Sequence, residues 1–311
     1  MPKPFPFIVS VGRSGTTLLR AMLERHPDLA IPPESYFPVS LAPAHARGPF
    51  DAGALFRDLA SNPRYRGWEL DTATARSALE GTSEYAEAMR GLYAAYAAAR
   101  GRSRYADKTP AFVLRMGALD RIFPESVFIH LVRDGRDVAA SLMEMPFGPS
   151  RLGRAAVLWH QWNGRGAISG AKLGPDRYLV LRYEDLVGEP EDALRRVCSF
   201  IDLDFRTEML EHRGNDTHLS AQESAHHASL ARPLTPNIRD WRTTLRAADA
   251  ALFDAIAGET LDRFGYERST AKVSAATRAR AVLEWTAFEA GREVRRRGRD
   301  IKAGVRRRTE R

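Results

Sequence analysis

The sequence has one cysteine, Cys198, among its 311 residues, so no disulfide bond can form within the chain. No apolar run approaches the roughly 20 residues that a membrane-spanning helix needs. The histidines between positions 212 and 227 match no zinc-ligand spacing and have no cysteine nearby, so we expect no metal site. The N-terminal residues lead into an apolar run without a secretory leader, which favours a cytoplasmic protein.

The net charge of +8 is concentrated at the C-terminal end. Residues 268–311 hold 14 of the lysines and arginines and 5 of the acidic residues, which leaves residues 1–267 close to neutral. We therefore predict one domain over 1–267 and a basic, mostly helical tail over 268–311. The tail suits peripheral contact with an anionic membrane, or it packs on the domain with a frayed basic end. We expect no nucleic-acid binding, and the sequence leaves the oligomeric state open.

A glycine-rich segment follows the first apolar run, Phe7–Val11, and precedes a helical pattern from Thr16. Backbone N–H groups freed by glycines and by a helix start bind anions, and hydroxyls and a guanidinium strengthen such a site. The loop of nucleotide triphosphatases reads G-x-x-x-x-G-K-[ST], whereas this segment has two residues between its glycines and no lysine after them. It therefore predicts a phosphate cradle for a different ligand. Its residues are Gly12, Arg13, Ser14, Gly15, Thr16, Thr17 and Leu18.

The order strand, polar turn, helix recurs along the chain. The apolar run Val127–Val132 is followed by Arg133, and Ser141 lies two turns into the next expected helix. A further strand is expected over Tyr178–Tyr183, and residues 51–100 have helical spacing. This pattern predicts an α/β fold with the ligand at the carboxyl ends of parallel strands. We expect a P-loop-like three-layer sandwich with a central parallel sheet, a helical insertion and a C-terminal helical tail.

The segment Gly12–Leu19 closely resembles the 5′-phosphosulfate loop of sulfotransferases that use 3′-phosphoadenylyl sulfate (PAPS), in the Arg-Ser-Gly-Thr-Thr form of bacterial members. The segment Phe128–Leu142 is similar to the 3′-phosphate motif of the same family. The resemblance extends from about residue 7 to residue 265. It implies PAPS as the donor, adenosine 3′,5′-bisphosphate as the product and a hydroxyl-bearing acceptor, with in-line transfer of the sulfuryl group and no metal.

The resemblance also implies which residues bind the donor. A late loop, Ile238–Arg242, resembles the family segment that closes over the 3′-phosphate and adenine, although it lacks the Arg-Lys-Gly form of the cytosolic branch. Tyr183 resembles a position beside the donor nucleotide. The implied donor-binding residues are Arg13, Ser14, Gly15, Thr16, Thr17, Leu18, Arg133, Ser141, Tyr183, Arg239, Trp241 and Arg242.

Three residues are implied to act in the transfer step. Glu34 matches the position of the proposed catalytic glutamate of tyrosylprotein-type sulfotransferases, and it would accept the acceptor's proton. Lys108, in the sequence Asp-Lys-Thr-Pro, matches a lysine near the reacting centre. Its ammonium and the Arg13 guanidinium would stabilise negative charge on the leaving phosphate and the transferred group.

Two alternatives stay open from the sequence. One is a nucleotide-dependent kinase with a degenerate P-loop, which would need a carboxylate to organise Mg²⁺. The other is a non-catalytic nucleotide-binding protein that docks on membranes through its basic tail. The motifs also leave the acceptor open among carbohydrate, lipid, small alcohol or phenol, and peptide.

Overall fold

The computed structural model describes residues 3–146, 148–211 and 240–309. The chain divides into two compact units. The first contains residues 1–133 and 162–238, and the second contains residues 134–161 and 239–311. The predicted division after residue 267 rests on charge along the chain and stays a prediction.

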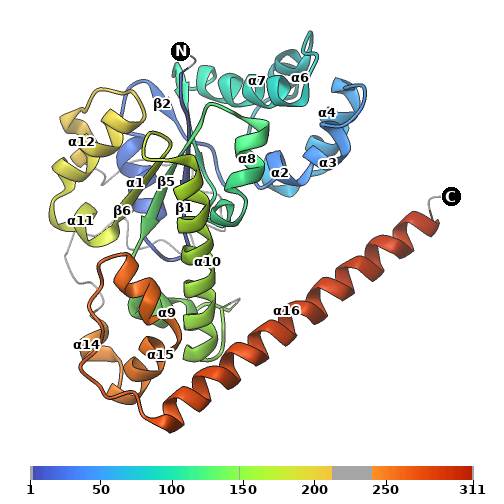
Figure 1. The fold of residues 1–311 in the computed structure, drawn as a ribbon. Helices are drawn as coiled ribbons and strands as arrows, with labels where there is room; N and C mark the ends of the chain where they lie inside the picture. Colours follow the sequence, from blue (N-terminus) through green and yellow to red (C-terminus); the bar gives the residue numbers. More distant parts are fainter. Residues whose placement is uncertain (1–2, 147, 212–239, 310–311) are drawn as a thin grey trace. The chain divides into compact units, whose positions relative to one another are not determined.

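The first unit contains a four-stranded sheet in which every pairing is parallel. Its spatial order is β4-β1-β5-β6, and the carboxyl ends of all four strands therefore lie at one edge (Figure 1). The predicted central parallel sheet is confirmed. The strands are β1 (Phe5–Val9), β4 (Asp107–Lys108), β5 (Ser126–Val132) and β6 (Tyr178–Arg182), and a separate pair is β2 (Leu29–Ala30) with β3 (Arg104–Tyr105).

Alternate side chains of the strands supply two apolar clusters, one on each face of the sheet. Phe5, Phe7 and Val9 of β1 belong to one cluster, and Ile8 belongs to the other. Helices cover both faces of the sheet, as Figure 1 shows, which confirms the predicted layers. On the first face lie η1 (Pro110–Leu114), α7 (Tyr85–Ala98) and α8 (Met116–Ile122), and on the second α1 (Thr16–Leu23), α11 (Tyr183–Gly188), α12 (Pro190–Phe200) and η2 (Thr207–Leu210).

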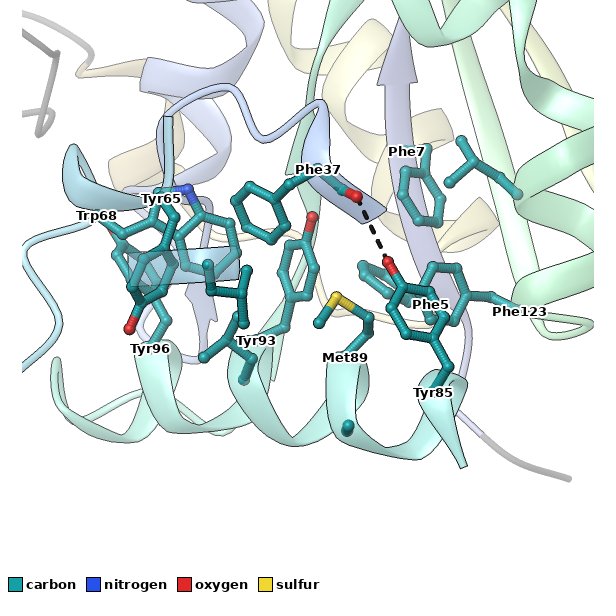
Figure 2. Packing of buried hydrophobic residues seen from close by; sticks show 14 of the residues in the cluster. Phe5, Phe7, Phe37, Tyr65, Trp68, Tyr85, Met89, Tyr93, Tyr96 and Phe123 are labelled. Atoms are coloured by element: carbon teal, nitrogen blue, oxygen red, sulfur yellow. Dashed lines mark hydrogen bonds between the residues drawn. The ribbon is translucent and has the colours of Figure 1, made fainter. Parts of the chain in front are cut away.

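The predicted helical insertion between β2 and β3 is also confirmed. Asp51 and Asp71 cap two of its helices by accepting hydrogen bonds from backbone N–H groups three residues on. Its apolar side chains pack around Trp68 and continue into the sheet cluster through Phe5 (Figure 2). The helices before α7 are α2 (Phe37–Ser40), α3 (Ala42–His45), α4 (Ala52–Ser61), α5 (Pro63–Arg66) and α6 (Thr72–Leu79).

Trp68 is expected to be the largest single contributor to the stability of this insertion. Its side chain is fully buried, its ring centroid lies 4.8 Å from that of Tyr93, and its Nε1 donates to the Pro33 carbonyl at 2.9 Å. Trp68→Ala should lower the free energy of unfolding by roughly 3–5 kcal/mol in urea denaturation. Trp68→Phe removes chiefly the hydrogen bond and should cost about 1–2 kcal/mol. Equal losses for the two variants would contradict this account.

His130 is predicted to make the first unit sensitive to acid. The side chain is fully buried on β5, where its Nε2 donates to Asn163 Oδ1 at 3.0 Å and its Nδ1 accepts from the Tyr178 hydroxyl at 2.6 Å. Burial lowers the pKa of His130 from 6.5 to about 4, so the folded chain keeps the imidazole neutral. The unfolded chain takes up this proton near pH 6.5, and stability is therefore lost as the pH falls from about 6.5 to 4.

The expected loss is roughly 3 kcal/mol when the pH has reached about 4. The loss would be measured as the difference between the free energies of unfolding in urea at pH 7.5 and at pH 4.5. His130→Gln does not titrate in this range, so its difference between the two pH values should be smaller by most of that amount. The same pH dependence in both proteins would contradict the prediction.

The second unit is helical. Its core forms where α15 packs on α9 and α16. The predicted C-terminal helical tail corresponds to α16, whereas residues 212–239 lie outside the described residues. The elements are α9 (Gly135–Met143), α14 (Trp241–Thr244), α15 (Ala247–Arg263), α16 (Ala275–Thr309) and the first turns of α10 (Leu152–Leu173).

The basic tail begins as part of this helical core. Ala281 and Glu284 of α16 are buried, and the Trp285 ring packs edge-on against His160 of α10. Val282 and Leu283 are exposed on the opposite side of the same turn. Across the ranges that the structure describes, no helix combines the length and the apolar character needed to cross a membrane.

Candidate functional site

The predicted phosphate cradle joins β1 to α1 at the carboxyl edge of the sheet. Gly15, the residue before the helix, has a φ of +94°, and Arg13 also lies in the left-handed region with a φ of +73°. Such a conformation is costly for arginine and is typical of ligand-binding turns. Ser14 is 1% exposed, and its Oγ makes no hydrogen bond with any residue that the structure describes. The loop therefore holds a buried hydroxyl ready for an anionic ligand.

Tyr183 connects this loop to Arg133. A Cβ atom on Gly15 would lie 2.3 Å from Tyr183 Cδ2, so only glycine permits the ring to pack there. The Arg133 guanidinium carbon lies 4.5 Å from the centroid of the same ring. The ends of β1, β5 and β6 thus bring together the loop, an arginine that is 9% exposed and a tyrosine between them. The family resemblance implied that these residues bind the donor.

The other hydroxyls and the helix start complete the loop. Thr16 and Thr17 are buried in the first turn of α1, and the side chain of Leu18 packs partly against the apolar cluster on that face. The side-chain hydroxyls of the loop therefore lie in a largely water-excluded environment. Hydrogen bonds to an anion are stronger in such a place than at an open surface.

Glu34 and Lys108 form an ion pair at the same edge of the sheet. Lys108 is the last residue of β4, and its Nζ lies 2.9 Å from Glu34 Oε1. The Lys108 side chain is 1% exposed and that of Glu34 is 17% exposed. Arg64 Nη1 lies 4.0 Å from the other oxygen of Glu34. The two residues predicted to take part in the transfer step are therefore in direct contact, although 74 positions separate them.

Several residues that the sequence analysis missed hold Glu34 in place. The Ser35 N–H donates to Thr109 Oγ1 at 3.0 Å, which ties the loop to the residue after Lys108. The Trp68 Nε1–H donates a hydrogen bond to the carbonyl of Pro33, the residue before Glu34. The prolines before Glu34 were the only visible signal that this loop is rigid. Thr109 and Trp68 lie far from Glu34 in the sequence, so the spacing of residues along the chain could not predict these contacts.

Tyr36 lies beside Glu34 in a strained backbone conformation, with a φ of +55°. Arg64 lies against both residues, because its guanidinium carbon is 4.9 Å from the Tyr36 ring centroid and its Nη1 is 4.0 Å from a Glu34 carboxylate oxygen. Burial, followed by the negative charge of Glu34, raises the pKa of Tyr36 well above its usual value. Tyr36 is therefore a neutral hydrogen-bonding group next to the carboxylate.

Asp107, the residue before Lys108, points into the core. It is fully buried and accepts a hydrogen bond from the Tyr93 hydroxyl at 2.6 Å. Burial raises the pKa of the Asp107 carboxyl, with the Tyr93 hydrogen bond acting in the opposite direction. Successive side chains of a strand point to opposite faces of the sheet, so the Asp107 side chain points into the core while the Lys108 side chain contacts Glu34.

The remaining predicted residues belong to the second unit. Ser141 is buried on α9, and Trp241 is 8% exposed at the start of α14. The guanidinium carbons of Arg136 and Arg242 lie 3.7 Å and 4.8 Å from the centroid of the Trp241 ring. Arg136, which the sequence analysis did not single out, stacks more closely than Arg242. Arg239 lies outside the described residues.

Arg136 is itself held by acidic partners. It makes two hydrogen bonds to the Asp134 carboxylate, at 2.9 Å and 2.7 Å, and its Nη1 lies 3.5 Å from Asp254 Oδ1.

In the part of the chain that the structure describes, no three histidine, cysteine, aspartate or glutamate side chains gather in a way that could hold a metal ion.

Comparison with known proteins identifies sulfotransferases. A family model described as "Sulfotransferase family" matches residues 4–207, and one described as "Sulfotransferase domain" matches residues 166–265. Among solved structures, the sulfotransferase domain from the Synechococcus PCC 7002 olefin synthase is 28% identical, with a TM-score of 0.58 over 78% of this chain and 88% of that one. The sulfotransferase domain from the curacin biosynthetic pathway, at 21% identity, has a TM-score of 0.60 over 86% and 99%.

Curated relatives share similar identities over parts of their length. Nodulation protein NoeE of Sinorhizobium fredii is 27% identical over 290 residues, which are 85% of this chain and 66% of that protein. The protein-tyrosine sulfotransferase of Drosophila melanogaster is 27% identical over 67% of this chain and 40% of its own. The omega-hydroxy-beta-dihydromenaquinone-9 sulfotransferase Stf3 of Mycobacterium tuberculosis is 31% identical over 52% and 41%. The chain thus spans about two fifths to two thirds of the length of these three relatives.

Proposed function

Because the chain belongs to the sulfotransferase family, we propose that it binds PAPS at the carboxyl edge of its parallel sheet and transfers the sulfuryl group to a hydroxyl of an acceptor. The family predicted from the motifs is confirmed by the match over residues 4–207. The same match favours a sulfotransferase over the kinase and over the non-catalytic nucleotide-binding protein.

One observation carries the assignment of this edge to the donor. The ends of the parallel strands carry an anion-binding loop with an unsatisfied buried hydroxyl on Ser14, together with Lys108 and Arg133. A donor with a phosphosulfate and a 3′-phosphate needs positive charge and N–H groups at two places. We assign the phosphosulfate to the loop at residues 12–18 and the 3′-phosphate to Arg133.

The transfer step is an in-line displacement at sulfur. The acceptor oxygen forms a bond to sulfur while the bond from sulfur to the 5′-phosphate oxygen breaks, and adenosine 3′,5′-bisphosphate leaves. Glu34 accepts the hydroxyl proton as general base. Lys108 and Arg13 stabilise the negative charge that develops on the leaving phosphate and on the transferred group. The chain's contribution is alignment and charge, as in phosphoryl transfer.

Four more residues are proposed to bind the donor. Ser141 would donate its hydroxyl to the 3′-phosphate, while Arg239 and Arg242 would add charge. Trp241 would contribute to adenine binding, and its ring already packs against Arg136. These assignments rest on the family resemblance of the segments that hold them.

The acceptor is proposed to be a hydroxyl compound. The names of two relatives specify protein tyrosine and an omega-hydroxy menaquinone derivative, which both carry hydroxyls. We also propose a cytoplasmic location, and the charge of residues 268–311 supports peripheral contact between the basic tail and anionic membranes.

Titration calorimetry with adenosine 3′,5′-bisphosphate tests the donor site. We expect tight binding that Arg133→Ala weakens roughly 10- to 100-fold, because a buried charged hydrogen bond to the phosphate is lost. Arg196→Ala removes an exposed arginine of α12 and should leave binding unchanged. Binding of ATP with Mg²⁺ but not of the bisphosphate would overturn the proposal in favour of a kinase.

A further inference from the structure

The first unit contains a cavity of about 780 Å³ that the donor assignment does not use. This volume is in the range of sites that bind small organic molecules. Residues from α2, α3, η1, α8 and α10 line it, and α2, α3 and α8 lie side by side in Figure 1. Its apolar wall includes Phe112, Leu114, Ile122 and Trp162.

Tyr36 places this cavity next to the proposed general base. The side chain lines the cavity, and the Arg64 guanidinium lies 4.9 Å from its ring centroid and 4.0 Å from Glu34 Oε2. The centroid of its ring lies 6.1 Å from that of Phe112 on the cavity wall. Tyr36 thus belongs both to the cavity wall and to the immediate surroundings of the proposed base.

Three arginines, Arg47, Arg115 and Arg121, also line the cavity, and all three are exposed. None of them forms an ion pair or a side-chain hydrogen bond with a residue that the structure describes. No aspartate or glutamate is present among the described lining residues. The cavity thus combines an apolar wall with positive charge that no carboxylate of the described fold neutralises.

Other arginines of the same unit behave differently. The guanidinium groups of Arg90, Arg177 and Arg195 each lie within hydrogen-bond distance of a carboxylate, with the closest contacts at 2.5–2.7 Å. The guanidinium fork matches the geometry of carboxylates and phosphates. The three cavity arginines are therefore suited to an anionic group that arrives with a ligand.

We propose that the acceptor is an amphipathic hydroxyl compound with an anionic group, a carboxylate or a phosphate. Its apolar body lies against Phe112, Ile122 and Trp162, its anionic group binds the arginines, and its hydroxyl reaches Glu34. This inference rests on the proposed sulfuryl transfer for the role of the hydroxyl. A neutral carbohydrate would leave most of its polar groups unpaired against such a wall.

Calorimetry on the full chain without donor tests the proposal, with 12-hydroxydodecanoate, dodecyl phosphate and 1,12-dodecanediol as probes below their micelle-forming concentrations. At least one anionic probe should bind tenfold or more tighter than the diol, and the better of the two identifies the anionic group. The triple variant Arg47→Gln, Arg115→Gln, Arg121→Gln should lose this preference. The matched triple variant Arg57→Gln, Arg66→Gln, Arg196→Gln removes the same charge from exposed positions outside the cavity lining and should keep it.

Equal binding of the anions and the diol, or unchanged anion binding by the cavity variant, would overturn the proposal. Failure of the proposed function is a separate result, because it would appear as absent binding of adenosine 3′,5′-bisphosphate. As a further check, 12-hydroxydodecanoate should accept radiolabelled sulfate from PAPS, and dodecanoate, which lacks the hydroxyl, should not. Labelling of both acids would contradict the placement of the hydroxyl at Glu34.

Discussion

Replacing Lys108 by alanine is expected to lower the rate of sulfuryl transfer by roughly a thousandfold. The ammonium is almost fully buried and lies 2.9 Å from Glu34 Oε1. Its loss removes the charge that stabilises the departing phosphate, and it leaves the Glu34 carboxylate without its closest cation. The rate would be measured in a single turnover, as transfer of radiolabelled sulfate from PAPS to an acceptor found by screening.

Calorimetry with adenosine 3′,5′-bisphosphate separates the possible roles of Lys108. If the lysine acts on the transition state, the variant should bind the bisphosphate within a few fold of wild type while its rate collapses. Lys172→Ala removes an exposed lysine of α10 and serves as the matched control. A rate within threefold of wild type would show that Lys108 is only a structural partner of Glu34.

The strands with long apolar runs were predictable, and the short polar strand was not. The strands β1, β5 and β6 follow from apolar segments that end in polar turns, a pattern typical of buried parallel strands. Asp107 and Lys108 carry charge and make a strand of two residues, which exists because it pairs with β1. Tertiary context here overrides the low strand propensity of both residues.

The residues of the site were predictable one at a time, whereas their contacts were not. Glu34 and Lys108 were each implied by a motif, but only the fold shows that they form one ion pair. Tyr36 lies beside Glu34, and Thr109 accepts a hydrogen bond from the N–H of the neighbouring Ser35. No periodicity in the sequence marks either residue. Trp241 was implied to bind the donor, and the structure adds that Arg136 packs on its ring.

The organisation of the second unit was the least predictable part. The division after residue 267, which rests on charge, stays a prediction; the sequence did not indicate that residues 134–161 join residues 239–311 in one compact unit. The reason is local packing. A Cβ on Gly135 would lie 2.6 Å from the Trp159 ring and 2.5 Å from that of Phe253, so α9 can pack tightly against α10 and α15. Contacts of this kind join segments that lie far apart in the sequence.

Replacing Glu34 by glutamine is expected to lower the transfer rate by roughly a hundred- to a thousandfold, because the amide keeps the size of the side chain but cannot accept the acceptor's proton. The loss should be largest for an aliphatic alcohol and smaller for an acidic phenol such as 4-nitrophenol, which needs less help from a base. Glu80→Gln, at an exposed position, is the matched control.

A double-variant cycle with Lys108 distinguishes proton transfer from simple disruption of the ion pair. Since the Lys108 ammonium contacts Glu34 directly, the losses of Glu34→Gln and Lys108→Ala should be strongly non-additive, and the double variant should be little slower than the slower single variant. The dependence on acceptor acidity should appear with Glu34→Gln and be absent with Lys108→Ala. If Glu34→Gln slows alcohols and phenols by the same factor, the carboxylate positions Lys108 and a different group accepts the proton.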